Sequence, residues 1–111
     1  MTALPDRLKL LGDPTRFKIL GFLADPTPEC CSAEGGVCAC DIEAFLGLSQ
    51  STVSHHMKQL VDAGMVRAER RGRWVYYELD PAALRELASV LAALADAAEE
   101  RVALSTGAAW T

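Results

Sequence analysis

Apolar residues near the start of the chain recur at helical spacing. Leu4, Leu8 and Leu11 follow one another at intervals of four and three residues, which places them on one face of a first helix. A second helix should start after Asp13, a residue type that caps helix N-termini, and continue to about Ala24. The prolines in the sequence DPTPE break this helix. A polar loop is therefore expected after two short helices.

The middle of the chain has the pattern of two helices joined by a tight turn. A short helix is predicted from Asp41 to Leu46 and is closed by Gly47, and a longer one follows the N-cap candidate Ser49. At 100° per residue, the apolar side chains of the longer helix fall on one side: Val53, Met57, Leu60 and Val61. Its other side is polar. This arrangement predicts a helix-turn-helix.

After the longer helix, the spacing of apolar residues changes from helical to alternating. The residues around Trp74 and Tyr76 alternate between apolar and polar, and the sequence ERRGR places a turn at Gly72. This pattern predicts a β-hairpin with an arginine-rich tip. Together with the helix-turn-helix it predicts a mainly α fold with a β-hairpin wing, which is a winged helix.

The last helix is expected from about Pro81 to Leu104. Its apolar positions are spaced by three and four residues: Leu84, Leu87, Leu91, Leu94 and Ala98. A helix of this length on so small a protein predicts a partner for its apolar stripe, and a second copy of the chain is the simplest one. Residues 105–111 are expected to be a frayed tail.

The chain has 111 residues, half of them apolar, which predicts one globular domain over residues 1–111. No stretch has the pattern of a signal peptide or of a membrane span. We therefore expect a cytoplasmic protein with no membrane partner and with reduced thiols.

The net charge of −4 argues weakly against a nucleic-acid partner, but charge is unevenly distributed. Residues 49–79 carry five basic and three acidic side chains, whereas residues 80–111 carry two basic and five acidic ones. The basic part coincides with the helix-turn-helix and the hairpin, so double-stranded DNA is the expected partner. The candidate contacts are Gln50, Ser51, Thr52, Ser54, His55 and Lys58 on the helix and Arg70, Arg71 and Arg73 on the wing.

All four cysteines lie within eleven consecutive positions: Cys30, Cys31, Cys38 and Cys40. They share a loop that we place at residues 25–40, which favours sensing over core packing. Thiolate clusters select soft or borderline ions, including As(III), Sb(III), Cd(II), Pb(II), Zn(II) and Cu(I). On a helix, positions i and i+2 point about 200° apart. We therefore expect Cys38 and Cys40 to share an ion only where the chain is extended or unwinds from helix.

The sequences LGDPTRFKIL, CACDIEAFLGLSQSTVSHHMKQLVDAGMV and RRGRWVYYELDP resemble, in order and spacing, the ArsR/SmtB family of metal-responsive winged-helix repressors. The resemblance covers roughly residues 4–95. It implies a homodimer through the first and last helices, and a metal-free form that represses a resistance operon and leaves DNA when metal binds. His55 departs from the family, where many members carry arginine, and should make a weaker and more pH-sensitive DNA contact.

The same resemblance assigns Cys38 and Cys40 to the cysteine pair of the family motif C-x-C-D-L. In the family's arsenic sensors this pair works with one further cysteine, which Cys30 or Cys31 would supply here. Cadmium and lead sensors use four thiolates, two of them from an N-terminal extension that this sequence lacks. We accordingly predict a repressor released by As(III) or Sb(III), with ion capture distorting the start of the Asp41–Leu46 helix and displacing the DNA-reading helix.

Other functions are compatible with parts of the sequence. A cadmium-, lead- or zinc-responsive repressor with four thiolates is one alternative, and a thiol redox-sensing repressor is another. A structural zinc module fits poorly, because C-C followed by C-x-C is not a zinc-ribbon spacing. The last helix contains no histidine, which argues against a zinc site there. No catalytic arrangement or organic cofactor motif is present, so we do not expect an enzyme.

Overall fold

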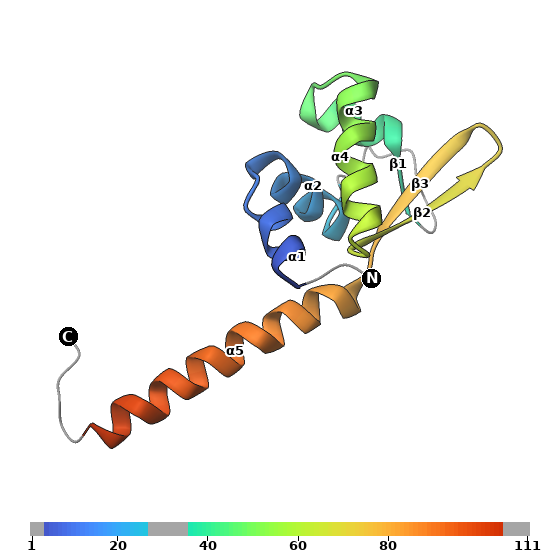
Figure 1. Cartoon of the computed structure of the whole chain (residues 1–111). Helices are drawn as coiled ribbons and strands as arrows, with labels where there is room; N and C mark the ends of the chain where they lie inside the picture. Colours follow the sequence, from blue (N-terminus) through green and yellow to red (C-terminus); the bar gives the residue numbers. More distant parts are fainter. Residues whose placement is uncertain (1–3, 27–35, 106–111) are drawn as a thin grey trace. The chain divides into compact units, whose positions relative to one another are not determined.

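The computed structural model describes residues 4–26 and 36–105 (Figure 1). Its elements follow one another in this order: α1 (Leu4–Leu11), α2 (Pro14–Ala24), β1 (Val37–Cys38), α3 (Ala39–Leu46), α4 (Gln50–Asp62), β2 (Val66–Arg71), β3 (Trp74–Leu79) and α5 (Pro81–Leu104). The chain forms two compact units, Met1–Pro81 and Ala82–Thr111.

The two residues predicted as N-caps do cap α2 and α4. Asp13 caps α2 by accepting a hydrogen bond from the backbone N–H of Arg16 at 3.0 Å. Ser49 caps α4 in the same way, with its Oγ atom accepting from the backbone N–H of Thr52 at 3.3 Å. Gly47 ends α3 at φ +67°, a conformation that suits glycine. The helix-turn-helix is therefore present where the sequence predicts it.

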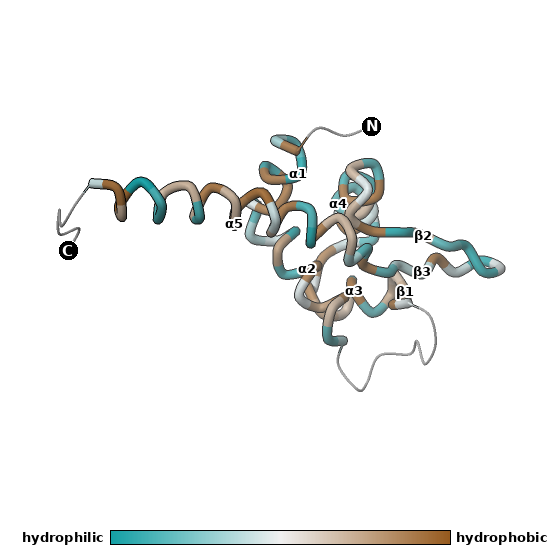
Figure 2. Tube along the Cα trace, turned by 90° about the horizontal axis from the view of Figure 1, so that it is seen from below, coloured by the Kyte–Doolittle hydropathy of each residue, from teal (hydrophilic) through white to brown (hydrophobic). Residues whose placement is uncertain are grey.

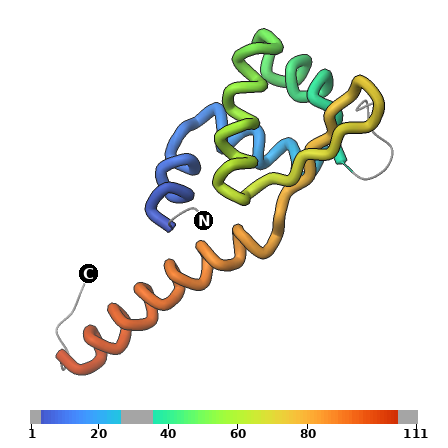
Figure 3. The backbone as a smooth tube through the Cα atoms, turned by 45° about the vertical axis from the view of Figure 1, so that its right-hand side comes forward, coloured from blue at the N-terminus to red at the C-terminus, as the bar shows by residue number. Residues whose placement is uncertain are grey.

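The first unit is built around apolar side chains from its helices and from the start of the hairpin. Fully buried members of this core are Ile19, Ile42, Val53, Met57, Leu60, Met65 and Val66. The buried side of α4 is the one predicted from its periodicity, although Val61 at the edge of that side is only half-buried. Burial of this face orients the polar side of α4 toward solvent, where it is available to a partner. Figure 3 traces the backbone from α3 through α4 into the hairpin.

The hairpin β2–β3 has the predicted turn, with Arg71 opposite Trp74 and Gly72 at φ +64°. A third strand that the sequence did not indicate joins it. β1 pairs antiparallel with β3 and gives a sheet of order β1-β3-β2. The expectation of a loop over residues 25–40 is therefore wrong for its last four residues, which form β1 and the first residues of α3. Pairing with a distant strand stabilises this short segment, and local periodicity carries no sign of it.

α5 is the only helix in the second unit, within the described residues. Apolar and polar positions alternate along it (Figure 2). Several of its large apolar side chains are exposed: Val90, Leu91, Leu94, Val102 and Leu104. Across residues 4–26 and 36–105, no helix has both the length and the apolar character needed to cross a membrane.

Candidate metal centre and nucleic-acid interface

Two cysteines meet at the junction of β1 and α3. Cys38 is extended, at φ −67° and ψ 143°, and occupies the N-cap position of α3. Cys40 lies in the first turn of that helix, and its Sγ atom is 2.9 Å from the Sγ atom of Cys38. Cys38 is 1% exposed and Cys40 is half-buried. The pair is thus closed on one side by protein and open on the other.

From the sequence we expected the two cysteines to share an ion only where the chain is extended or unwinds from helix, and their sulfurs approach here with Cys38 extended, the first of these two conditions. α3 begins at Ala39, two residues earlier than predicted, yet only Cys40 is helical. The extended backbone of Cys38 turns its side chain toward the first turn of the helix, so the separation of about 200° between helical i and i+2 positions does not apply.

Asp41 adds an oxygen to this cluster. One ligand atom each from Cys38, Cys40 and Asp41 lie within 4.8 Å of one another, and no other group of three or more His, Cys, Asp or Glu side chains is so placed in the described part of the chain. We did not single out Asp41 as a ligand from the sequence, although its position directly after Cys40 was the signal. Cys30 and Cys31, the other predicted thiolate ligands, lie outside the described residues.

The thiol pair is joined to the wing by backbone pairing. Val37 lies opposite Tyr77 and Cys38 opposite Tyr76, so the strand that ends at the thiol site is an edge strand of the hairpin sheet. Gly36 precedes it at φ +123°, and a Cβ atom there would lie 3.1 Å from the carbonyl oxygen of Tyr77. Burial, and to a smaller extent the charge of Glu43, raises the pKa of Tyr77.

The predicted DNA-contacting residues of α4 are all exposed: Gln50, Ser51, Thr52, Ser54, His55 and Lys58. Some already have local partners. The Oγ1 atom of Thr52 lies 2.9 Å from the Oγ atom of Ser49, and Lys58 forms an ion pair with Asp62 at 3.2 Å. His56 points the other way, and its Nδ1 atom is buried without a hydrogen-bond partner among the described residues.

The three wing arginines are exposed but not equivalent. The guanidinium group of Arg71 contacts the carboxylate of Glu69 at 2.6 Å and lies 4.4 Å from the ring centroid of Tyr76. Arg73 lies over the ring of Trp74 at 5.5 Å, near the tip of the hairpin. The sequence predicted all three as phosphate contacts, yet Arg71 has an intramolecular partner of opposite charge.

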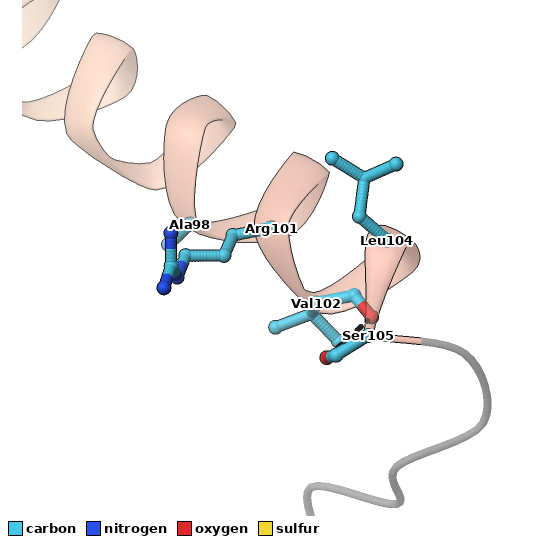
Figure 4. Close-up of a pocket in the computed structure, with 5 residues that line it drawn as sticks. All are labelled: Ala98, Arg101, Val102, Leu104 and Ser105. Atoms are coloured by element: carbon cyan, nitrogen blue, oxygen red, sulfur yellow. Dashed lines mark hydrogen bonds between the residues drawn. The ribbon is translucent and has the colours of Figure 1, made fainter.

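A hollow at the end of α5 is lined by Ala98, Arg101, Val102, Leu104 and Ser105 (Figure 4). Four of these residues belong to the last turns of α5 and Ser105 follows its end, where the hydroxyl of Ser105 donates to the carbonyl oxygen of Val102 at 3.2 Å. The lining is mainly apolar. Such a surface suits packing against another apolar face better than binding of a polar ligand.

Comparison with known proteins gives a consistent result. Residues 13–68 match the model for bacterial regulatory proteins of the arsR family. A Halobacterium salinarum protein named "Putative arsenical resistance operon repressor ArsR2" is 41% identical over 64% of this chain and 54% of its own length. The arsenic resistance transcriptional regulator ArsR1 of Pseudomonas putida is 34% identical over 86% of this chain and 69% of its own length. The chain thus spans about half of the first of these relatives.

Relatives named for another metal are also similar. A cadmium resistance regulatory protein, a CadC homolog from Staphylococcus aureus, is 35% identical over 71% of this chain and 59% of its own length. Among solved structures, the AntR antimony-specific transcriptional repressor is 31% identical, with a TM-score of 0.57, 83% of this chain and 77% of that chain covered. An ArsR-like regulator from Rhodococcus sp. RHA1 has the same fold, with a TM-score of 0.75 at 24% identity over 91% of this chain and 84% of that one.

Proposed function

Because this chain belongs to the arsR family of bacterial regulatory proteins, which are DNA-binding transcriptional repressors and not enzymes, we propose that it represses an operon and releases its operator on binding As(III) or Sb(III). The observation that carries this proposal is the 2.9 Å separation of the Cys38 and Cys40 Sγ atoms. In this proposal the natural inducer is a thiophilic ion. One such ion can bind both thiolates of a pair that lies this close together.

The geometry of the pair supports capture of a single ion. In a tetrahedral zinc–thiolate site with bonds of about 2.3 Å, two sulfurs lie about 3.8 Å apart. The Cys38 and Cys40 thiols would therefore have to separate by less than 1 Å, which rotation about one side-chain torsion can provide. As(III) takes three soft thiolates, and we propose that Cys30 or Cys31 supplies the third.

Ligand capture at this pair has two routes to the DNA-binding surface. Cys38 is the N-cap of α3, and α3 packs against α4, so movement of its first turn shifts the support of the recognition helix. Cys38 also pairs with Tyr76 of β3, so the same movement reaches the wing. Release requires that the inducer bind the DNA-free conformation more tightly than the DNA-bound one.

We further propose that α4 enters the major groove and that the wing contacts phosphates. The exposed face of α4 offers hydroxyl, amide and imidazole groups near its N-terminus, which suit base edges and phosphate oxygens. The wing offers Arg70 and Arg73 without a carboxylate partner among the described residues, and these suit the phosphate backbone. Two half-sites about one helical turn apart would be read by a homodimer.

The proposed dimer uses α1 and α5. Leu8 of α1 is 40% exposed, and Leu91 and Leu94 of α5 are 54% and 64% exposed. Large apolar side chains at helical spacing on one helix need a covering surface. A second copy of the chain provides the same surface and satisfies both copies at once.

Two alternative inducers deserve direct comparison with arsenite. The S. aureus relative named for cadmium resistance, together with the oxygen of Asp41 beside the thiols, favours Cd(II) or Zn(II) as the second candidate. Close approach of the two thiols also makes oxidation to a disulfide a candidate signal.

The test is operator binding followed by fluorescence anisotropy under reducing conditions, with separate titrations of arsenite, antimonite, cadmium, lead and zinc. Cys38→Ser and Cys40→Ser are expected to bind operator but to lose the response to arsenite. Cys30→Ser and Cys31→Ser identify the third thiolate. Release by cadmium or lead alone would contradict the As(III)/Sb(III) assignment, and release by peroxide in metal-free buffer would favour the redox alternative.

A further inference from the structure

An arginine at the start of α2 contacts two other helices at once. The Nη1 atom of Arg16 donates a 2.6 Å hydrogen bond to the Oε1 atom of Gln59 in α4. Its Nε atom donates to the carbonyl oxygen of Leu10 in α1 at 3.2 Å, and its backbone N–H donates to Asp13. Arg16 therefore links the α1–α2 junction to the half-buried Gln59, which lies one helical turn after the exposed His55 on α4.

A second arginine contacts the end of the same helix. The Nε atom of Arg7, in α1, donates a 2.9 Å hydrogen bond to the carbonyl oxygen of Ala63, the C-cap residue of α4. The last carbonyl groups of a helix have no partner within the helix and carry partial negative charge, so a guanidinium group at this position is favourable. Its Nη2 atom lies 3.1 Å from the position that a Cβ atom of Gly64 would take, which leaves little room for a side chain there.

These polar contacts restrict α4 in a way that its apolar face does not. Burial of Val53, Met57 and Leu60 decides which side of the helix faces the core, but apolar contact has little directional preference. A hydrogen bond depends steeply on distance and angle. Contacts at Gln59 and Ala63 therefore fix the rotation of α4 about its axis and its position along that axis.

Small rotations of α4 matter for the exposed polar residues in its N-terminal half. A side-chain tip about 5 to 6 Å from the helix axis moves by roughly 2 Å when the helix turns by about 20°. Base-edge hydrogen bonds do not survive a displacement of that size. Phosphate contacts made by long basic side chains tolerate it better, because they depend mainly on charge.

We propose that Arg7 and Arg16 are positioning residues that orient α4 for sequence-specific DNA reading and do not themselves contact DNA. This inference rests on the proposed reading of DNA by α4. It assigns to two half-buried basic side chains of the first unit a role in which their hydrogen bonds determine sequence selectivity and leave affinity for phosphates unchanged.

The experiment compares two duplexes in anisotropy titrations over a range of salt concentrations. One duplex is selected from a random-sequence pool by the wild-type protein, and the other is a scrambled version of it. The variants are Arg16→Met, Gln59→Met and their combination, with Arg7→Met for the second contact. Lys18→Met is the matched control, because it removes one exposed positive charge from the same helix as Arg16.

Arg16→Met and Gln59→Met should each weaken binding to the selected duplex about tenfold, since each removes the same hydrogen bond to a charged group. Binding to the scrambled duplex and the salt dependence should stay as in wild type, and the double variant should be no worse than either single one. Lys18→Met should leave the ratio of the two affinities unchanged.

Gln59→Glu separates positioning from general stability, because glutamate keeps an acceptor for Arg16. It should retain the selectivity that Gln59→Met loses, at similar melting temperature. Equal behaviour of the two Gln59 variants would overturn the inference. So would an Arg16→Met variant that loses affinity for both duplexes with a salt slope smaller by about 0.9, because that is the sign of a phosphate contact.

Failure of the wild-type protein to select any duplex would overturn the proposed repressor function and this inference with it. Selection by the wild type with no change of selectivity in the variants would overturn this inference alone.

Discussion

The Sγ atoms of Cys38 and Cys40 lie 2.9 Å apart although the two residues belong to different secondary structures. Cys38 ends a strand and Cys40 lies in the first turn of a helix, and the extended backbone of Cys38 directs its thiol toward that turn. β1 therefore ends, and α3 begins, at this pair of cysteines. Any change in the separation of the two sulfurs acts on both elements.

Asp41 should distinguish between classes of inducer. Asp41→Asn removes the charged oxygen that lies within 4.8 Å of both thiols, and a soft ion such as As(III) has little use for that oxygen. We expect arsenite-induced release to be unchanged and the affinity for Cd(II) to fall roughly tenfold. Parallel anisotropy titrations with the two ions measure this. A tenfold loss with arsenite as well would show that Asp41 is needed by both ions.

Gly36 should matter to the thiol site through the strand that it precedes. Alanine there adds a Cβ atom 3.1 Å from the carbonyl oxygen of Tyr77, on a backbone at φ +123°. The substitution should lower the free energy of unfolding by on the order of 1 to 3 kcal/mol and weaken the β1–β3 pairing. Gly47→Ala is the matched control, because it has positive φ but nothing within 4 Å of the added atom. Urea unfolding and arsenite titration should both show a larger loss for Gly36→Ala. Equal losses would mean that the pairing does not support the site.

The wing arginines should differ in their salt dependence. Arg70→Ala and Arg73→Ala should each reduce the slope of log K against log salt by about 0.9, the value for one phosphate contact. Arg71→Ala should reduce it by less, since the guanidinium group of Arg71 is already 2.6 Å from the carboxylate of Glu69. Operator titrations at several salt concentrations measure the slopes. An Arg71 slope change as large as that of Arg73 would show that Glu69 gives up its partner to DNA.

The inner face of α4 should dominate the stability of the first unit. Leu60→Ala removes a fully buried side chain and should lower the free energy of unfolding by about 2 to 5 kcal/mol. Lys58→Ala, two residues earlier, should cost less than about 1 kcal/mol, because both partners of its ion pair with Asp62 are largely exposed. Urea denaturation followed by circular dichroism gives both values. Comparable costs for the two variants would contradict the assigned orientation of α4.

Asp13 should make the protein less stable in acid. The backbone N–H of Arg16 is the main cause that lowers the pKa of Asp13 below its usual value of 3.8. A carboxyl with a lowered pKa in the folded state contributes stability above its unfolded pKa, and this contribution is lost as the pH falls through the folded value. Asp13→Asn keeps a capping oxygen without the charge, so its melting temperature should vary less with pH below about 4. Identical pH profiles would show that the charge contributes nothing.

Features that depend on near neighbours could be predicted from the order of residues alone. Asp13 and Ser49 cap helices, Gly47 ends one, and Gly72 turns the hairpin, each through contacts within a few residues. The buried face of α4 follows from the spacing of its apolar residues. These signals are local. Together they were enough to predict the helix-turn-helix and the wing, and to recognise the resemblance to the family.

Contacts between distant groups became visible only in the folded chain. β1 exists because Val37 pairs with Tyr77, forty residues away, and that pairing leaves Cys38 extended beside Cys40. Arg16 reaches Gln59 only after α2 and α4 have packed, and Arg71 meets Tyr76 only across the paired strands. Such contacts depend on the register and orientation of elements far apart in the sequence. The spacing of residues along one element carries no record of them.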